Sequence, residues 1–252
     1  LLEHAGLQPG FLIGGVPANF ATTARLGAGD YFVIEADEYD TAFFDKRAKF
    51  LHYGPQTLVI NNLEFDHADI YKNIDAILWQ FHQMLRIMPG AGRVIVNAAE
   101  PAIDDLLDMG CWSSLERYTS MAGYKDAWRL QPTSAGFELT APDGSAAGEA
   151  RLRLPGAHNA ENAVAAVLAA RHAGVDLAAA LGGLAAFTGV KRRMEFLGDF
   201  SGVTVYDDFA HHPTAIRRTL EAARQAFGGR VVAVLEPRSN SMKLGAHRAE
   251  LP

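Results

Sequence analysis

Two acidic clusters in this 252-residue sequence carry side chains that could bind a cation. The first, residues 35–40, reads Glu-Ala-Asp-Glu-Tyr-Asp and follows an apolar run typical of a buried strand. Its four carboxylates repel one another unless a positive charge lies among them, and a divalent cation would supply that charge. A solvated acidic loop explains the same composition, so the pattern alone leaves both interpretations open.

The second acidic cluster, residues 61–69, reads Asn-Asn-Leu-Glu-Phe-Asp-His-Ala-Asp and again follows an apolar run. His67, next to Asp66, could be a metal ligand whose imidazole ring is oriented by a carboxylate. By its softness an imidazole favours zinc or manganese over magnesium. A purely structural histidine fits the pattern equally well.

Two further clusters have the composition of a nucleotide site. Gly156 precedes a predicted helix whose free N–H groups could meet an anion or a base, and Asn159 and Asn162 lie one turn apart on it. Residues 191–193 are Lys-Arg-Arg, three consecutive cations that suit phosphate recognition. Ordinary helix capping and a solvated basic linker are the respective alternatives.

The fifth cluster, residues 207–213, reads Asp-Asp-Phe-Ala-His-His-Pro at the end of a predicted strand. Asp208 could hold ribose hydroxyls, because an acidic residue at a strand end is a usual ribose partner in α/β proteins. Two aspartates and two histidines could equally form a metal site. The spacing does not decide between them.

Alternating strands and helices must position these clusters. Continuous apolar runs predict buried strands at 11–13, 31–34, 57–60 and 93–97, and 3.6-residue periodicity predicts helices at 74–88 and 102–109. This alternation indicates a doubly wound, mostly parallel α/β sheet. Residues 136–154 predict an appended antiparallel hairpin, followed by helices at 158–173 and 177–186.

A change of pattern near residues 188–191 suggests a linker between two domains, 1–187 and 188–252. After it the alternation restarts, with strands near 195–197, 203–206 and 231–235 and a helix at 214–227. Residues 1–6 resemble the last turn of a helix closed by a glycine, and the chain lacks an initiator Met. We therefore expect a piece of a longer protein.

The composition limits the classes of function. The 23 basic and 29 acidic residues give a net charge of −6, so no basic excess favours nucleic-acid binding. The longest apolar run, residues 163–170, is far shorter than the roughly 20 residues that a membrane helix needs. A single cysteine, Cys111, excludes an internal disulfide and fits a reducing compartment. We expect a cytoplasmic protein that binds neither nucleic acid nor membrane and needs no obligate protein partner.

Taken together and in this order, the five clusters resemble those of the Mur ligases, the ATP-dependent amide-forming enzymes of peptidoglycan synthesis. The Glu-Ala-Asp-Glu and Asp-His-Ala-Asp motifs resemble the branch that acts on UDP-N-acetylmuramate. Within it, residues 43–50 and 236–243 resemble members that attach the recycled tripeptide L-Ala-γ-D-Glu-meso-diaminopimelate. Members that attach L-alanine are the alternative.

The resemblance implies ATP and Mg²⁺ as cofactors. Glu35 and His67 would hold the magnesium ion beside the γ-phosphate, and Arg193 would reach the phosphates from the second domain. The implied fold is the Mur ligase central domain followed by part of a Rossmann-like C-terminal domain. ATP would phosphorylate the sugar's carboxylate, and the amine of the tripeptide would attack the acyl phosphate.

The resemblance also implies a nucleotide site. Asn159 and Asn162 would border the base, Asp208 would bind the ribose, and His158 and His211 would lie nearby. The family's phosphate-binding loop and its UDP-sugar domain have no match in the sequence, so the chain alone is not expected to turn over.

Two other classes remain open. A metal-dependent hydrolase would use residues 207–212 and His67, and would bind zinc or manganese without nucleotide. A non-catalytic nucleotide-sugar module would keep its affinity for nucleotide without Glu35.

Overall fold

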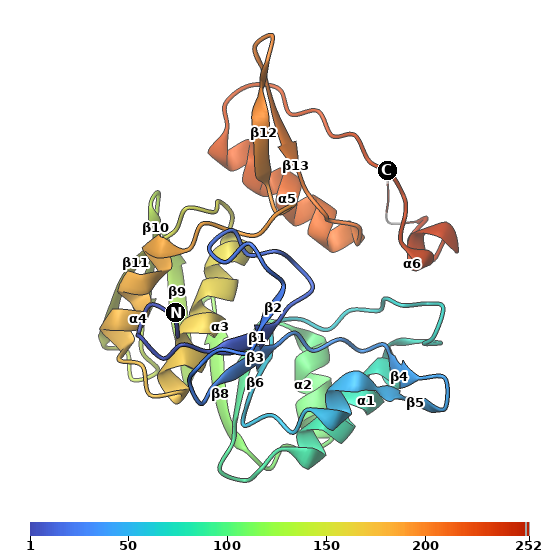
Figure 1. The fold of residues 1–252 in the computed structure, drawn as a ribbon, viewed down its shortest axis with the longest axis vertical. Coiled ribbons are helices and arrows are strands. Elements are labelled where there is room, and N and C mark those ends of the chain that lie inside the picture. Colours follow the sequence, from blue (N-terminus) through green and yellow to red (C-terminus); the bar gives the residue numbers. More distant parts are fainter. Residues whose placement is uncertain (250, 252) are drawn as a thin grey trace.

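The computed structural model describes residues 1–249 and 251 and contains a six-stranded sheet between two layers of helices (Figure 1). The strand order is β11-β10-β9-β8-β7-β6, and the first four strands in sequence run parallel while the last two form the antiparallel extension. The strands are β6 (Thr57–Ile60), β7 (Arg93–Asn97), β8 (Ser114–Thr119), β9 (Ala127–Pro132), β10 (Gly136–Thr140) and β11 (Ala146–Arg151). The predicted fold class, a mostly parallel α/β sheet with an antiparallel hairpin, is confirmed.

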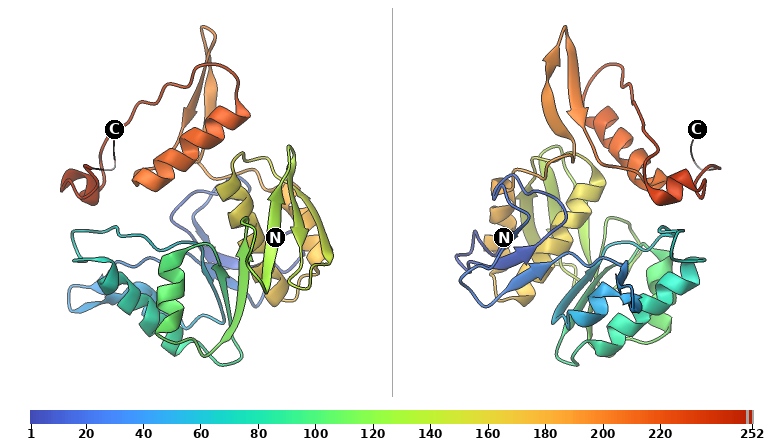
Figure 2. Two further views of the ribbon diagram at one scale, coloured as in Figure 1. Left: turned by 180° about the vertical axis from the view of Figure 1, so that it is seen from behind. Right: turned by 45° about the vertical axis from the view of Figure 1, so that its right-hand side comes forward.

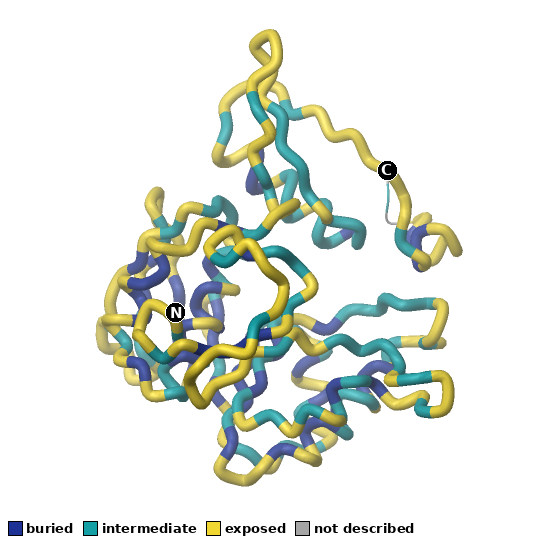
Figure 3. The backbone as a smooth tube through the Cα atoms, in the orientation of Figure 1, coloured by how far each residue is buried: buried dark blue, intermediate teal, exposed yellow. Residues whose placement is uncertain are grey.

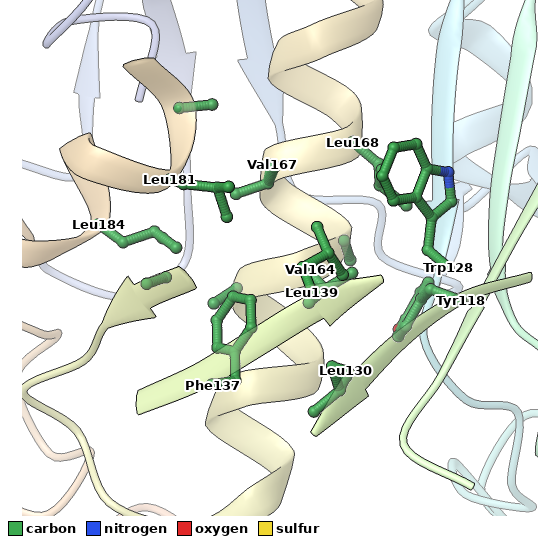
Figure 4. Packing of buried hydrophobic residues seen from close by; sticks show 14 of the residues in the cluster. Tyr118, Trp128, Leu130, Phe137, Leu139, Val164, Val167, Leu168, Leu181 and Leu184 are labelled. Carbon is green, nitrogen blue, oxygen red and sulfur yellow. The ribbon is translucent and has the colours of Figure 1, made fainter. Parts of the chain in front are cut away.

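Helices cover both faces of this sheet, and the interior strand β7 is apolar on both sides. In β7, Ile95 belongs to one buried cluster and Val94 and Val96 belong to another. The first cluster includes buried residues of α3 (Ala157–His172), α4 (Leu177–Gly183) and η2 (Leu184–Ala186), and Figure 4 shows its side chains between these helices and the sheet. The second packs under α1 (Ile74–Ile87), α2 (Pro101–Asp108) and η1 (Lys49–His52).

Two small sheets precede this body in the sequence. The strands β1 (Gly10–Leu12), β2 (Ala24–Arg25) and β3 (Phe32–Ile34) form a three-stranded sheet, and β4 (Asp40–Ala42) and β5 (Asp45–Ala48) form a hairpin. The strands predicted at 11–13 and 31–34 exist and run parallel to each other, but no ladder hydrogen bonds join them to the main sheet.

The C-terminal elements stand apart from this body (Figure 2). A hairpin of β12 (Glu195–Phe200) and β13 (Val203–Asp207) packs with α5 (Pro213–Ala226), and the chain ends near α6 (Asn240–Lys243). Figure 3 shows fewer buried residues here than in the body.

The strand predicted at 231–235 is wrong. Among the described residues, no strand pairs with this segment, and most of its apolar side chains are exposed, with Val234 98% exposed. An apolar run forms a strand only where a partner completes its hydrogen bonds.

Residues 1–6 form the predicted helical turn. The amide of Gly6 donates to the carbonyl of Glu3 and the amide of Leu7 to that of Leu2, and Gly6 has a φ of 76°. This bond pair is the Schellman motif, which places a glycine in the left-handed region. In the part of the chain that the structure describes, no helix combines the length and apolarity needed to cross a membrane.

Candidate active site

A cleft of about 1330 Å³ lies where the body meets the C-terminal elements. From the body it is lined by the segment after β6, by β8 and by the start of α3, and from the C-terminal part by residues near β13 and α5. Crevices beyond the carboxyl ends of parallel strands are where open α/β sheets bind ligands. The cleft includes five of the eight predicted site residues: His158, Asn159, Asn162, Arg193 and Asp208. The other three, Glu35, His67 and His211, do not line it.

A chain of hydrogen bonds fixes the amide side chains on one wall. The hydroxyl of Tyr118, on β8, donates to Asn61 Oδ1 at 2.8 Å, and Asn61 Nδ2 donates to Asn162 Oδ1 at 3.0 Å. Asn159 Nδ2 donates to the carbonyl of Pro155 at 2.6 Å, which secures the start of α3. The two predicted amides therefore have different partners: Asn162 is bonded to the segment after β6, and Asn159 to Pro155, just before the start of α3.

His158 lies beside these amides at the start of α3. Burial, together with the charge of Arg218, lowers its pKa below the ordinary histidine value. A neutral imidazole offers both a donor and an acceptor to a ligand.

The acidic segment after β3 supplies the partner of His67. His67 Nε2 lies 2.8 Å from Glu38 Oε1, and the ring of Tyr39 packs edge-on against the imidazole at 4.3 Å. Burial alone would lower the pKa of His67, but the hydrogen bond and charge of Glu38 outweigh it and raise the pKa. The carboxylate of Glu35 instead accepts the backbone amide of Gly14 at 2.6 Å. Sequence reasoning missed Glu38 as the residue that contacts His67, although it lies in the same acidic cluster.

These residues suit a magnesium ion better than a metal held by protein alone. Among residues 1–249 and 251, no three His, Cys, Asp or Glu side chains gather closely enough to hold a metal. Mg²⁺ commonly keeps several waters and takes only one or two protein ligands together with substrate phosphates, so a sparse donor set fits it. A zinc site needs three or four protein ligands.

The side chains of residues 207–212 have partners other than a metal. Asp207 accepts from Arg192 at 3.1 Å, and His212 lies 3.4 Å from Glu64. A ring nitrogen of His211 lies 3.0 Å from the carbonyl of Phe209. The geometry therefore does not support the metal-dependent hydrolase.

Asp208 and Arg193 approach the cleft from the C-terminal part. Asp208 accepts the amides of Met194 and Ala210 at 2.9 and 2.8 Å, and these bonds fix the turn after β13. The guanidinium of Arg193 lies 5.9 Å from the ring centre of Phe209 and forms no ion pair with any described residue. A cationic group in this position is available to an anionic ligand.

Arg218 and Glu64 join the two walls, and the sequence reasoning did not single them out. Arg218, on α5, lies 3.4 Å from both Glu161 and Glu100 of the body. Glu64 accepts the hydroxyl of Thr214 at 2.6 Å. Thr214 and Arg218 are four residues apart, so helical periodicity places them on one face, and that spacing was the available signal.

Two family models match the chain and together cover most of it. The Mur ligase middle domain matches residues 14–170, and the Mur ligase glutamate ligase domain matches residues 192–248. The chain belongs to the Mur ligase family.

Its relatives indicate a branch within the family. It is 51% identical to the UDP-N-acetylmuramate--L-alanyl-gamma-D-glutamyl-meso-2,6-diaminoheptandioate ligase of Escherichia coli K12, over 100% of this chain and 55% of the relative. It is 40% identical to the UDP-N-acetylmuramate--L-alanine ligase of Mycolicibacterium vanbaalenii, over 94% of this chain and 50% of that relative. The chain thus spans about half the length of the curated relatives it matches.

Solved structures of Mur ligases also resemble this chain. The murein peptide ligase of Psychrobacter arcticus superposes with a TM-score of 0.74 at 42% identity, covering 95% of this chain and 54% of that chain. The UDP-N-acetylmuramate-alanine ligase of Thermotoga maritima gives a TM-score of 0.71 at 26% identity, covering 90% of this chain and 50% of that one.

Proposed function

We propose that this chain is the nucleotide-binding part of an ATP-dependent ligase that joins UDP-N-acetylmuramate to the tripeptide L-Ala-γ-D-Glu-meso-diaminopimelate. The observation that carries this proposal is the 51% identity along the entire chain to a tripeptide ligase, against 40% to an L-alanine ligase. A cleft with an arginine and an aspartate on one wall and amides on the other supports nucleotide binding. A cytoplasmic location is part of the proposal, because the reaction consumes ATP.

The residues would act mainly by positioning and by charge. Asn159 and Asn162 border the base, and Asp208 binds the ribose, since a carboxylate has acceptor sites beyond the two that backbone amides use. Arg193 neutralises charge on the transferred phosphoryl group. Closure of the C-terminal wall excludes water from the acyl phosphate until the tripeptide's amine attacks it.

Glu35 and His67 would hold a magnesium ion, which supplies charge neutralisation at the phosphates. The contact between His67 and Glu38 gives Glu38 a separate role. A carboxylate hydrogen-bonded to one ring nitrogen of an imidazole fixes the ring's orientation and tautomer. Replacing such a group typically costs 10- to 100-fold in metal affinity or activity. We therefore expect Glu35→Gln to abolish ligation and Glu38→Gln to weaken it by roughly that factor.

The test uses the whole protein that contains this chain, with UDP-N-acetylmuramate, ATP and Mg²⁺. ADP release is compared between the tripeptide and L-alanine. Release only with the tripeptide supports the proposal, and release only with L-alanine assigns the protein to the alternative branch. Release with neither amine refutes the ligase function.

The nucleotide assignment has its own matched pair of variants. Asp208→Asn should raise the KM for ATP more than the KM for the tripeptide. Asp207→Asn, the neighbouring change outside the cleft, should leave both close to the parent values. Equal KM values for ATP in the parent and the Asp208 variant would contradict the ribose role.

A further inference from the structure

The short helix α6 contacts the loop that carries His67 although about 170 residues separate them in the sequence. Ser241 is 2% exposed, and its hydroxyl donates to Asp66 Oδ1 at 2.5 Å and accepts the amide of Ala68 at 3.3 Å. The side-chain amide of Asn240 donates to Asp69 Oδ2 at 2.9 Å. Two consecutive residues of the C-terminal part thus bond to three of the four residues of the loop 66–69.

These bonds surround a residue in an unfavourable backbone conformation. His67 has a φ of 54°, in the left-handed region, which is unfavourable for a non-glycine residue. Such a conformation persists only where the surroundings determine it. Asp66 Oδ1 also accepts the amide of His67 at 2.7 Å, so the Ser241 hydroxyl is bonded to groups on both sides of the strained residue.

The charge of Asp66 strengthens this arrangement. Its Oδ1 atom accepts both the Ser241 hydroxyl and the His67 amide. Hydrogen bonds to an ionised carboxylate are roughly twice as strong as neutral ones.

We propose that Asn240 and Ser241 are positioning residues, which hold loop 66–69 so that the His67 imidazole stays against Glu38. This inference rests on the proposed function for the role of His67, and it adds that the C-terminal part sets the geometry of a group in the middle domain. When α6 leaves the loop, Asp66 and the Ala68 amide lose their partner, and the left-handed conformation of His67 loses its support. The ligand geometry is then complete only when the two parts are together.

Apolar packing of α6, rather than its hydrogen bonds, could also hold the loop 66–69. A substitution at Asn240 distinguishes these two explanations. Met242, the next residue but one, is buried and anchors α6 by apolar contact, whereas Asn240 is exposed and contributes mainly its hydrogen bond to Asp69. A substitution at Asn240 therefore tests the polar contact with little effect on packing.

The first experiment measures hydrogen–deuterium exchange of the segment 64–71 in the whole protein without ligands. Asn240→Asp places a carboxylate opposite that of Asp69, and Ser241→Ala removes the acceptor of the Ala68 amide. We expect exchange in this segment to become at least tenfold faster in both variants. The double variant Asn240→Asp/Asp69→Asn restores a donor–acceptor pair with reversed polarity and should return exchange towards the parent rate. Ser134→Ala, an exposed serine in the turn between β9 and β10, is the matched control.

The second experiment measures ADP release against Mg²⁺ concentration in the same variants. Loss of positioning should raise the Mg²⁺ concentration for half-maximal release severalfold, leave the KM for UDP-N-acetylmuramate unchanged, and be reversed in the double variant. Unchanged exchange in both variants overturns the proposal, as does faster exchange with unchanged Mg²⁺ dependence. If Ser241→Ala fails to fold, the exposed Asn240 variants carry the test. A parent protein that releases no ADP with either amine refutes the proposed function, while the exchange data still decide whether α6 holds the loop.

Discussion

Replacing Tyr118 by phenylalanine should loosen the wall of the cleft by removing one oxygen atom. The ring of Tyr118 is fully buried in the core, and its hydroxyl donates to Asn61, which in turn donates to Asn162 (Figure 4 shows the ring). Phenylalanine keeps the ring and removes the hydroxyl, so Asn61 loses the donor that orients it. The effect should therefore reach Asn162 at the nucleotide site.

The magnitude follows from one hydrogen bond in a partly buried place. The net contribution of such a bond is about 1 kcal/mol, and an acceptor left without a donor costs about 1–3 kcal/mol when water cannot reach it. Asn61 is half-buried and lines the cleft, so water can replace the lost donor, which favours the lower end. We expect a loss of about 1–2 kcal/mol in the free energy of unfolding. For a protein of this size this corresponds to a decrease in Tm of roughly 2–8 °C.

The assay is thermal and urea unfolding followed by circular dichroism, together with ATP binding by calorimetry. Tyr206→Phe is the matched control, because the hydroxyl of Tyr206 makes no hydrogen bond with the described residues while its ring stacks on Phe227 at 4.7 Å. We expect ATP affinity to fall in Tyr118→Phe and to stay unchanged in the control. The reasoning is refuted if both variants lose the same stability, or if Tyr118→Phe binds ATP as the parent does.

Two further predictions concern buried charge. The pKa of His158 is lowered in the folded protein, so the unfolded chain binds a proton at a higher pH than the folded chain does. The free energy of unfolding should therefore fall as the pH drops below about 6.5, by at most about 1.4 kcal/mol per pH unit. Urea unfolding at pH 7.5 and 5.5 should show a smaller decrease in His158→Gln than in the parent, and an equal decrease would contradict the assignment. Glu116 is buried and accepts from Trp128 at 2.6 Å and from Arg93 at 3.1 Å. Glu116→Ala should lower the free energy of unfolding by about 3 kcal/mol, the lower end of the cost of breaking a buried ion pair. The control is Glu138→Ala at an exposed position, which should change the free energy of unfolding by less than about 0.5 kcal/mol.

The body of the fold follows from local patterns in the sequence. The continuous apolar run of β7 predicts a strand buried on both faces, and the 3.6-residue spacing of α1 predicts a helix that begins at Ile74, as observed. The segment 231–235 shows the same type of run but forms no strand, since pairing depends on a neighbour that the run itself does not encode.

Local sequence patterns predict only part of the candidate site. Order and spacing of the motifs identified the family and the cleft residues on α3. They did not reveal that Glu38 contacts His67, because this contact depends on how two segments 29 residues apart in the sequence fold together. The bond between Ser241 and Asp66 spans 175 positions, so no periodicity could reveal it.

The structure also locates the pivot about which the two walls could close. The linker predicted near residues 188–191 is bonded to the body: the carbonyl of Gly189 accepts the amide of Ala18, and the amide of Lys191 donates to the carbonyl of Val16. Arg192 and Arg193 are bonded to both parts, since the carbonyl of Arg192 accepts the amide of Phe209 at 2.7 Å and the amide of Arg193 donates to the carbonyl of Val190 at 3.1 Å.

A rotation at Gly189 would break the bond between Lys191 and Val16, and a rotation between Lys191 and Arg192 would break the bond between the Arg193 amide and the Val190 carbonyl. Arg192 also has a φ of 59°, a conformation that a small backbone change can relieve. The pivot therefore lies within residues 189–193, and closure would move the Arg193 guanidinium with the C-terminal wall. The polar contacts that such a rotation must rearrange include those of Arg218 with Glu161, of Thr214 with Glu64, and of α6 with the loop 66–69. Partly exposed polar contacts of this kind contribute little individually, and the two walls can separate and rejoin at modest cost.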